Sequence, residues 1–198
     1  MKSTIFISGS HGSGKSTLLN KLLSSHEFFF ENTFNIDFLT EFPSMKTMTH
    51  FERCLVRLYH RIYCTNYVQQ LTMKYPEKVL VTSRGIYDSL AYIKSYKEFD
   101  WISNEEFLKL NFIINYSGYL PYTIILNPPF ETIKSRLNKR RAIGSRRLRD
   151  EVFNHEDSDE FIISMCNSFA SLADLNNVLY LEDNGEKEIE MILKWVKN

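Results

Sequence analysis

An eight-residue run near the start of the chain constrains its fold more than any other part of the sequence. Residues Gly9 to Ser16 read Gly-Ser-His-Gly-Ser-Gly-Lys-Ser, which fits the pattern G-x-x-x-x-G-K-[S/T] at every specified position. A β-rich run, Thr4 to Ser8, precedes the loop, and leucines at helical spacing follow from Lys15 onward. This strand–loop–helix context predicts a loop whose backbone N–H groups, together with a helix N-terminus, hold the phosphates of a nucleotide.

The loop positions have predicted tasks. Glycines have no Cβ and accept positive φ, so the backbone can curl around phosphates. We expect Lys15 to reach the β- and γ-phosphates of ATP, and the Ser16 hydroxyl to bind Mg²⁺. His11 occupies an unspecified position of the pattern and is assigned no chemistry of its own. The alternative for the whole run Gly9 to Ser16 is a flexible glycine turn with a solvated lysine. The other residues predicted to contact the nucleotide are Gly9, Ser10, His11, Gly12, Ser13, Gly14 and Thr17.

Length and composition narrow the choice of partners. The 198 residues are enough for one sizeable domain, and 24 basic residues balance 24 acidic ones. A neutral chain has no global field to attract nucleic acid or an anionic membrane, so we expect a small-molecule partner. No apolar stretch approaches the ~18 residues that span a bilayer. Three widely spaced cysteines fit neither a disulfide framework nor a zinc site, and the N-terminus does not resemble a signal peptide, which favours a cytoplasmic protein with reduced thiols.

Short β-rich runs alternate with helical patterns along the chain, which predicts an α/β fold with a parallel sheet flanked by helices. The expected strands are Thr4–Ser8, Phe34–Thr40, Val79–Thr82, Tyr122–Leu126 and Val178–Leu181. The expected helices begin near Lys15 and Phe130 and cover about His50–Lys74, Tyr87–Tyr96, Asn104–Tyr116, Asp157–Asn176 and Glu186–Val196.

A second motif follows the buried strand at Val79–Thr82. Ligands of open parallel sheets bind outside the carboxyl ends of the strands, so Arg84 is expected to contact a phosphate. An exposed arginine leaving a strand is the alternative. With the loop, Arg84 and the run Ser89-Leu90-Ala91-Tyr92 resemble the thymidylate kinase and deoxynucleoside kinase group of phosphate-loop kinases. Arg84, Gly85, Asp88, Ala91 and Tyr92 are also similar to nicotinamide riboside kinase-like ATPases.

The resemblance implies a three-layer phosphate-loop fold with strand order 2-3-1-4-5, built as one domain over residues 1–198. It implies ATP- and Mg²⁺-dependent transfer of a phosphoryl group to a nucleoside or nucleoside monophosphate. The sequence departs from the family at Ser83, where relatives carry an acid before the arginine. Glu41 is the best replacement, because by the same resemblance it would orient the acceptor hydroxyl and take its proton. A solvated loop acid is the alternative for Glu41.

A basic segment at about residues 134–151 stands out in this neutral chain. In the resembling kinases a basic lid at this place closes on ATP, and arginine forks stabilise the charge of the transferred phosphoryl group. Arg136, Arg140 and Arg147 fit that placement best, and Arg140 and Arg147 are taken as catalytic candidates. A solvated basic face and contact with nucleic acid are the alternatives.

The long helical pattern carries three arginines, Arg53, Arg57 and Arg61, at a spacing of four, so they form one stripe. In thymidylate kinase-like proteins, which the chain resembles, this region lines the acceptor pocket. The resemblance therefore makes Arg53 and Arg57 candidates to bind the acceptor, and Phe42 or Tyr59 could stack on its base. A solvated stripe is the alternative. Tyr59, Tyr63 and Tyr67 recur at the same spacing, and core packing is the favoured interpretation for them.

The sequence leaves other functions open. An ATPase or ATP-binding switch with a macromolecular partner is the main alternative, because Ser83 replaces the family acid. The acceptor, the base preference and the oligomeric state, with a homodimer as one option, are not readable from the sequence.

Overall fold

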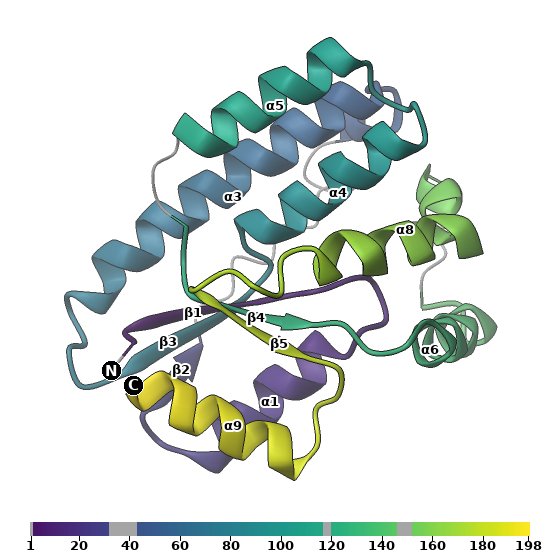
Figure 1. Cartoon of the computed structure of the whole chain (residues 1–198). Helices are drawn as coiled ribbons and strands as arrows, with labels where there is room; N and C mark the ends of the chain where they lie inside the picture. Colours follow the sequence, from purple (N-terminus) through teal and green to yellow (C-terminus); the bar gives the residue numbers. More distant parts are fainter. Residues whose placement is uncertain (1, 32–42, 117–119, 146–151) are drawn as a thin grey trace.

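The computed structural model of the chain describes residues 2–31, 43–116, 120–145 and 152–198. Its centre is a five-stranded sheet in the order β2-β3-β1-β4-β5, with every neighbouring pair parallel (Figure 1). This confirms the expected α/β class and strand order. The strands are β1 (Thr4–Ser8), β2 (Phe29–Glu31), β3 (Val79–Ser83), β4 (Thr123–Leu126) and β5 (Val178–Leu181).

The middle strands are apolar along their length because helices cover both faces of the sheet. All five residues of β1 are buried, and so are four of the five in β3. The helices are α1 (Lys15–Ser25), α3 (His50–Thr72), α4 (Ile86–Glu98), α5 (Asn104–Tyr116), α6 (Phe130–Ala142), α8 (Asp159–Ala170) and α9 (Glu186–Lys197), and two 3-10 turns, η1 (Pro43–Lys46) and η2 (Asn154–Asp157), join them.

Two hydrophobic cores lie on opposite faces of the sheet. One is closed by α1 and α9, whose Leu18, Leu22 and Ile192 are fully buried against β1, β3 and β4. The other is formed by α3, α4, α5 and α8, with Leu58 and Phe161 among its fully buried members. Figure 1 shows this arrangement, with α5 lying beyond α3 and α4 and α6 standing apart near the end of β4.

Helix α3 has a well-defined start. The Thr49 hydroxyl accepts a hydrogen bond from the Glu52 backbone N–H, and the Glu52 carboxylate accepts one from the Thr49 backbone N–H. This capping box satisfies two N–H groups that a helix start would otherwise leave unpaired. The cap fixes the first turn of α3, which carries Arg53, and Arg57 follows one turn later.

The structure differs from the expected boundaries of one helix and contains a strand before the range expected for the second one. The second strand is β2 at Phe29–Glu31, because Phe28 to Glu31 follow directly on the end of α1 and pair with Val79–Val81. The range expected for it, 34–40, lies outside the described residues. The helix expected at 157–176 is α8, which ends at Ala170 and is preceded by η2.

The thiols agree with the sequence-based interpretation. Cys54 and Cys64 are buried, Cys166 is half-buried, and all three are free. Burial raises the pKa of Cys54 to about 12 and that of Cys166 to about 11, so both stay protonated near neutral pH. Within the described part of the chain, no helix is both long and apolar enough to cross a membrane.

Candidate active site

The glycine-rich loop joins β1 to α1 and takes a backbone path that only glycine follows easily. Gly9, Gly12 and Gly14 have φ of 150°, 77° and 103°. A Cβ on Gly9 would lie 2.3 Å from the Leu126 carbonyl oxygen at the end of β4. The loop therefore sits directly against the carboxyl end of the sheet, where ligands of such sheets bind.

Lys15 points into the curve of the loop. Its ammonium donates hydrogen bonds to the carbonyl oxygens of Gly9 and Ser10, both at 2.7 Å, and to Ser13 Oγ at 3.3 Å. Burial and then the charge of Arg84 lower the pKa of Lys15 to about 7. The ammonium is thus held among loop atoms in a strongly positive setting that favours an anion.

The first turn of α1 completes this setting. Gly14 is the N-cap of α1, and no acidic residue stands in the first turn, so the positive end of the helix dipole is uncompensated. Ser16 and Thr17 are exposed there, with their hydroxyls available to a ligand. The loop, Lys15 and this helix start are brought together as predicted.

Arg84 lies beside the loop, as expected. It is a non-glycine residue with φ of 69°, directly after β3, and its backbone N–H donates to the Ile7 carbonyl oxygen at 2.9 Å. Its guanidinium Nη2 lies 3.5 Å from His11 Nδ1. A left-handed conformation costs a non-glycine residue roughly 1–2 kcal/mol, which the fold sustains at a site facing the phosphate loop.

His11 has neighbours that its unspecified loop position did not reveal. Its Nε2 forms a hydrogen bond with the Tyr92 hydroxyl and lies 3.8 Å from Glu156 Oε2. These contacts connect the phosphate loop to α4 and η2, two elements distant in sequence.

Glu156 is the main site residue that sequence reasoning missed. Its side chain is fully buried, it accepts a hydrogen bond from Arg57 Nη1 at 3.3 Å, and it accepts another from the Tyr96 hydroxyl. Burial and the Glu156 charge hold the pKa of Tyr96 well above its usual value, so the phenol stays a donor. In the sequence, Glu156 is simply an acid shortly after the basic segment. Acids are common in surface turns, so this position alone does not indicate a buried site residue.

The arginine stripe of α3 is turned mostly away from solvent, with Arg53 buried and Arg57 and Arg61 half-buried. Burial opposes the charge of Arg57, but the nearby Glu156 carboxylate holds the pKa of its guanidinium above the usual value. Burial and Arg84 lower the pKa of Arg61 to about 10. Arg53 donates to the carbonyl oxygens of Met45 at 2.9 Å and Lys46 at 3.2 Å, so it secures η1 to the helix.

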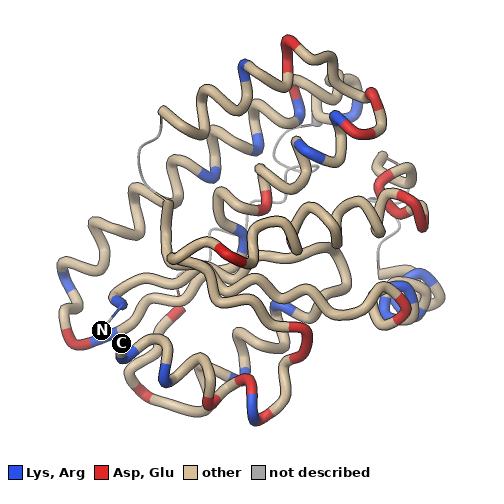
Figure 2. The backbone as a smooth tube through the Cα atoms, in the orientation of Figure 1, with Lys and Arg blue, Asp and Glu red and all other residues tan. Residues whose placement is uncertain are grey.

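The basic helix α6 touches the phosphate loop through one arginine. Arg136 Nη1 donates to the carbonyl oxygens of Ser13 at 2.6 Å and Gly12 at 3.3 Å. Figure 2 shows positive residues gathered on α6, facing acidic residues of η2 and the start of α8. Lys134 pairs with Asp159, and Arg141 lies 3.4 Å from Asp157. Arg140 is close enough to the loop for its charge to lower the pKa of Lys15.

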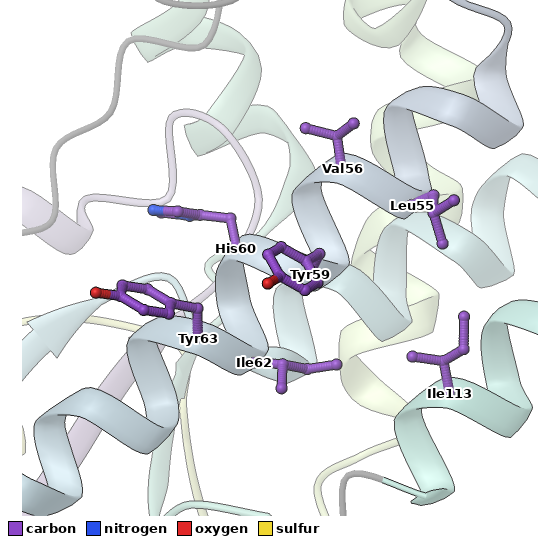
Figure 3. A pocket seen from close by; sticks show the side chains of 7 residues that line it. All are labelled: Leu55, Val56, Tyr59, His60, Ile62, Tyr63 and Ile113. Carbon is purple, nitrogen blue, oxygen red and sulfur yellow. The ribbon is translucent and has the colours of Figure 1, made fainter.

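Three predicted residues, Glu41, Phe42 and Arg147, lie outside the described residues. The expectation that Tyr59, Tyr63 and Tyr67 pack in a core was wrong, because they are 74%, 54% and 36% exposed. Tyr59 and Tyr63 instead line a hollow of about 760 Å³ between α3 and α5 (Figure 3). The residues around this hollow are Leu55, Val56, Tyr59, His60, Ile62, Tyr63 and Ile113.

The glycine-rich loop, with its buried lysine, lies between the central strand and the first helix of a parallel sheet. In this sheet order, the arrangement defines a phosphate-loop nucleotide-binding protein. The sequence pattern of the deoxynucleoside kinase family matches residues 5–152, and the chain belongs to that family. It is therefore a kinase of the nucleoside kinase type. A sequence search among curated proteins gave no match.

Solved structures agree with this fold. One of deoxyadenosine kinase from M. mycoides, with products dCMP and a flexible dCDP bound, has a TM-score of 0.71 at 16% identity and covers 98% of each chain. The same kinase with bound dATP has a TM-score of 0.67 at 15% identity, covering 99% of this chain and 100% of that one. With bound dCTP, the TM-score is 0.67 at 17% identity, with 98% of each chain covered.

Proposed function

We propose that this kinase transfers the γ-phosphoryl group of ATP to a sugar hydroxyl of a deoxynucleoside. The observation that carries the proposal is that Lys15 is held inside its glycine loop, while the fully buried Glu156 and the half-buried Arg57 and Arg61 lie beside that loop. The loop suits the phosphates of ATP. The hydrogen-bonding groups of Arg57, Arg61 and Glu156 suit the polar base and the sugar hydroxyls of a nucleoside. Bound deoxynucleotides in the similar deoxyadenosine kinase support this choice of acceptor.

On the donor side, the loop N–H groups and the Lys15 ammonium hold the β- and γ-phosphates. The Ser16 hydroxyl is exposed at the start of α1 and is a suitable ligand for Mg²⁺, which prefers oxygen. One protein ligand is enough when the phosphates of ATP supply further oxygen ligands. When bound, Mg²⁺ neutralises charge on the β- and γ-phosphate oxygens.

The transferred group needs positive charge around it. Arg84, from the end of β3, and Arg140, from α6, supply that charge in our proposal, with Arg147 as a further lid arginine. Arg136, already on the loop carbonyls, links the lid helix to the nucleotide site. We treat residues 1–198 as one domain in which the segment at about 134–151 acts as the lid.

On the acceptor side, Glu41 orients the hydroxyl and takes its proton, and Phe42 stacks on the base. Arg57 contacts the acceptor from α3 in this proposal, through donors that Glu156 leaves free. Arg53 acts on the same pocket mainly by fixing η1, because its guanidinium is bonded to backbone carbonyls.

A screen of acceptors tests the proposal. Purified protein with ATP and Mg²⁺ should form ADP only when a deoxynucleoside is added, and the phosphorylated acceptor should appear in equal amount. Deoxynucleosides, their monophosphates and nicotinamide riboside form the panel. ADP formation that needs no acceptor, or that only a protein or nucleic acid stimulates, would overturn the assignment in favour of an ATPase or switch.

We also propose that the kinase works as a cytoplasmic homodimer with small molecules as its partners, without nucleic acid or membrane. Free cysteines support a reducing compartment. Large apolar side chains on the outer faces of α3 and α5 support a dimer, since exposed patches of this kind mark interfaces. The most exposed of them are Tyr59, Phe112 and Tyr116, at 74%, 68% and 82%.

A further inference from the structure

Asp88 is a buried acid whose two oxygens join separate parts of the nucleotide site. It lies in the first turn of α4 and is 3% exposed. One oxygen, Oδ2, accepts a hydrogen bond from the Gly85 backbone N–H at 2.9 Å, which caps the helix. The other, Oδ1, accepts one from the Gly9 backbone N–H at 3.4 Å. Asp88 therefore ties the first residue of the phosphate loop to the end of β3.

Asp88 also stands among cations. The charged groups that shift the pKa of Lys15 are three arginines and one acid. The arginines are Arg84, just after β3, Arg140 of α6 and Arg61 of α3, and the acid is Asp88 of α4. The three arginines disfavour the charge of Lys15, whereas Asp88 favours it. Asp88 favours the charge of Arg61 in the same way. A carboxylate at this point lets several positive groups converge before any phosphate is bound.

Asp88 also supplies a carboxylate near the end of β3, where Ser83 has none. It brings this carboxylate from the next helix to the backbone amides of Gly85 and Gly9. Both Asp88 oxygens already accept hydrogen bonds from backbone amides, so its role differs from that proposed for Glu41, which acts on a substrate hydroxyl.

We propose that Asp88 is a positioning residue for phosphoryl transfer, which holds Gly9 and the Lys15 ammonium in register with the transferred phosphoryl group. The inference rests on the proposed function. Because Asp88 acts through the loop, its loss should affect the chemical step more than nucleotide binding. Removing the negative charge of Asp88 increases the attraction of the site for ATP, and this offsets the weaker binding expected of a loosened loop. The rate is more sensitive, because a misplacement of reacting groups by about 1 Å can cost ~100-fold.

The test compares Asp88→Asn with Glu98→Gln, a control on the same helix whose carboxylate accepts a hydrogen bond from the Ser164 hydroxyl. Asparagine keeps the size and one oxygen that can cap Gly85, but it loses the charge and directs an N–H₂ group at Gly9. We expect kcat to fall by ~10- to 100-fold in Asp88→Asn, with the KM of ATP and of the acceptor changing less than ~3-fold. Glu98→Gln should keep the wild-type kcat.

A second readout does not depend on catalysis. Hydrogen exchange of the nucleotide-free protein should show the Gly9 amide exchanging at least ~10-fold faster in Asp88→Asn, while amides late in α4 keep their protection. Asp88→Ser, which keeps a short cap for Gly85, should show the same loss and serves if the asparagine variant folds poorly. Unchanged kcat, a rise in KM alone, or unchanged Gly9 exchange would overturn the role of Asp88. A wild-type protein without acceptor-dependent turnover would overturn the proposed function instead.

Discussion

At the scale of single residues, Lys15 is the group on which nucleotide binding most depends. Its ammonium makes three hydrogen bonds to loop atoms, which hold it inside the loop before ATP arrives. A side chain already held at the site loses less conformational entropy when it moves onto the phosphates.

Replacing Lys15 with alanine should therefore weaken ATP binding by ~30-fold or more, about 2 kcal/mol, the size of a hydrogen bond to a charged group. The stabilisation that ATP gives wild-type protein in a thermal melt should be lost. Lys187→Ala, which removes an exposed lysine of α9, is the control and should leave that stabilisation intact. ATP-dependent stabilisation retained in Lys15→Ala would place the nucleotide elsewhere.

Gly9 tests the backbone of the loop. Alanine there should destabilise the fold by on the order of 3 kcal/mol, because its Cβ would lie 2.3 Å from the Leu126 carbonyl oxygen at a φ of 150°. Gly144→Ala is a matched control, since Gly144 has a φ of 69° with nothing near its Cβ position, and it should cost only about 1 kcal/mol. Urea unfolding measures both values, and equal costs would contradict the close contact with β4.

Individual site residues were predictable only where a local pattern fixes them. The loop from Gly9 to Ser16 is such a case, because the chemistry of phosphate binding sets both residue types and spacing. Glu156 and the contacts of His11 were not predictable, because they depend on η2 packing against α3 and α4. A single acid after a basic segment has no periodicity from which its burial could be read.

At the scale of elements, the spacing of Arg53, Arg57 and Arg61 correctly placed them on one stripe of α3. The spacing did not reveal which stripe faces inward, because polar and apolar residues are mixed on every side of α3. Burial beside Glu156 and η1 makes the arginine stripe internal, and that leaves the tyrosine stripe outside.

The outer stripe leads to a prediction about assembly. If α3 and α5 pack against a second copy, charged residues in place of Tyr59 and Phe112 should halve the molar mass measured by light scattering during gel filtration. The control is Ile143→Asp, which changes a side chain that is 78% exposed at the end of α6. This variant should have the same dimer mass as the wild-type protein. A wild-type protein of monomer mass, or a double variant that remains dimeric, would contradict this interface.

At the scale of the whole molecule, the positions of most strands and helices followed well from the sequence, because buried parallel strands are short apolar runs and amphipathic helices repeat with the helical period. The strand order followed from the resemblance to phosphate-loop kinases. Strand β2 was not predicted, because the pairing of Phe29–Glu31 with β3 is a contact between distant segments that no local pattern reveals. The fold then brings the ends of β1 and β3, the stripe of α3, and η2 around one site.

The most direct test of the account is a crystal structure with Mg²⁺ and a non-hydrolysable ATP analogue. We predict that the β- and γ-phosphates lie against the backbone N–H groups of Gly12 to Ser16, with the Lys15 ammonium on them and the Ser16 hydroxyl on the metal. Phosphates bound away from this loop, with Lys15 still on the Gly9 and Ser10 carbonyls, would contradict the account.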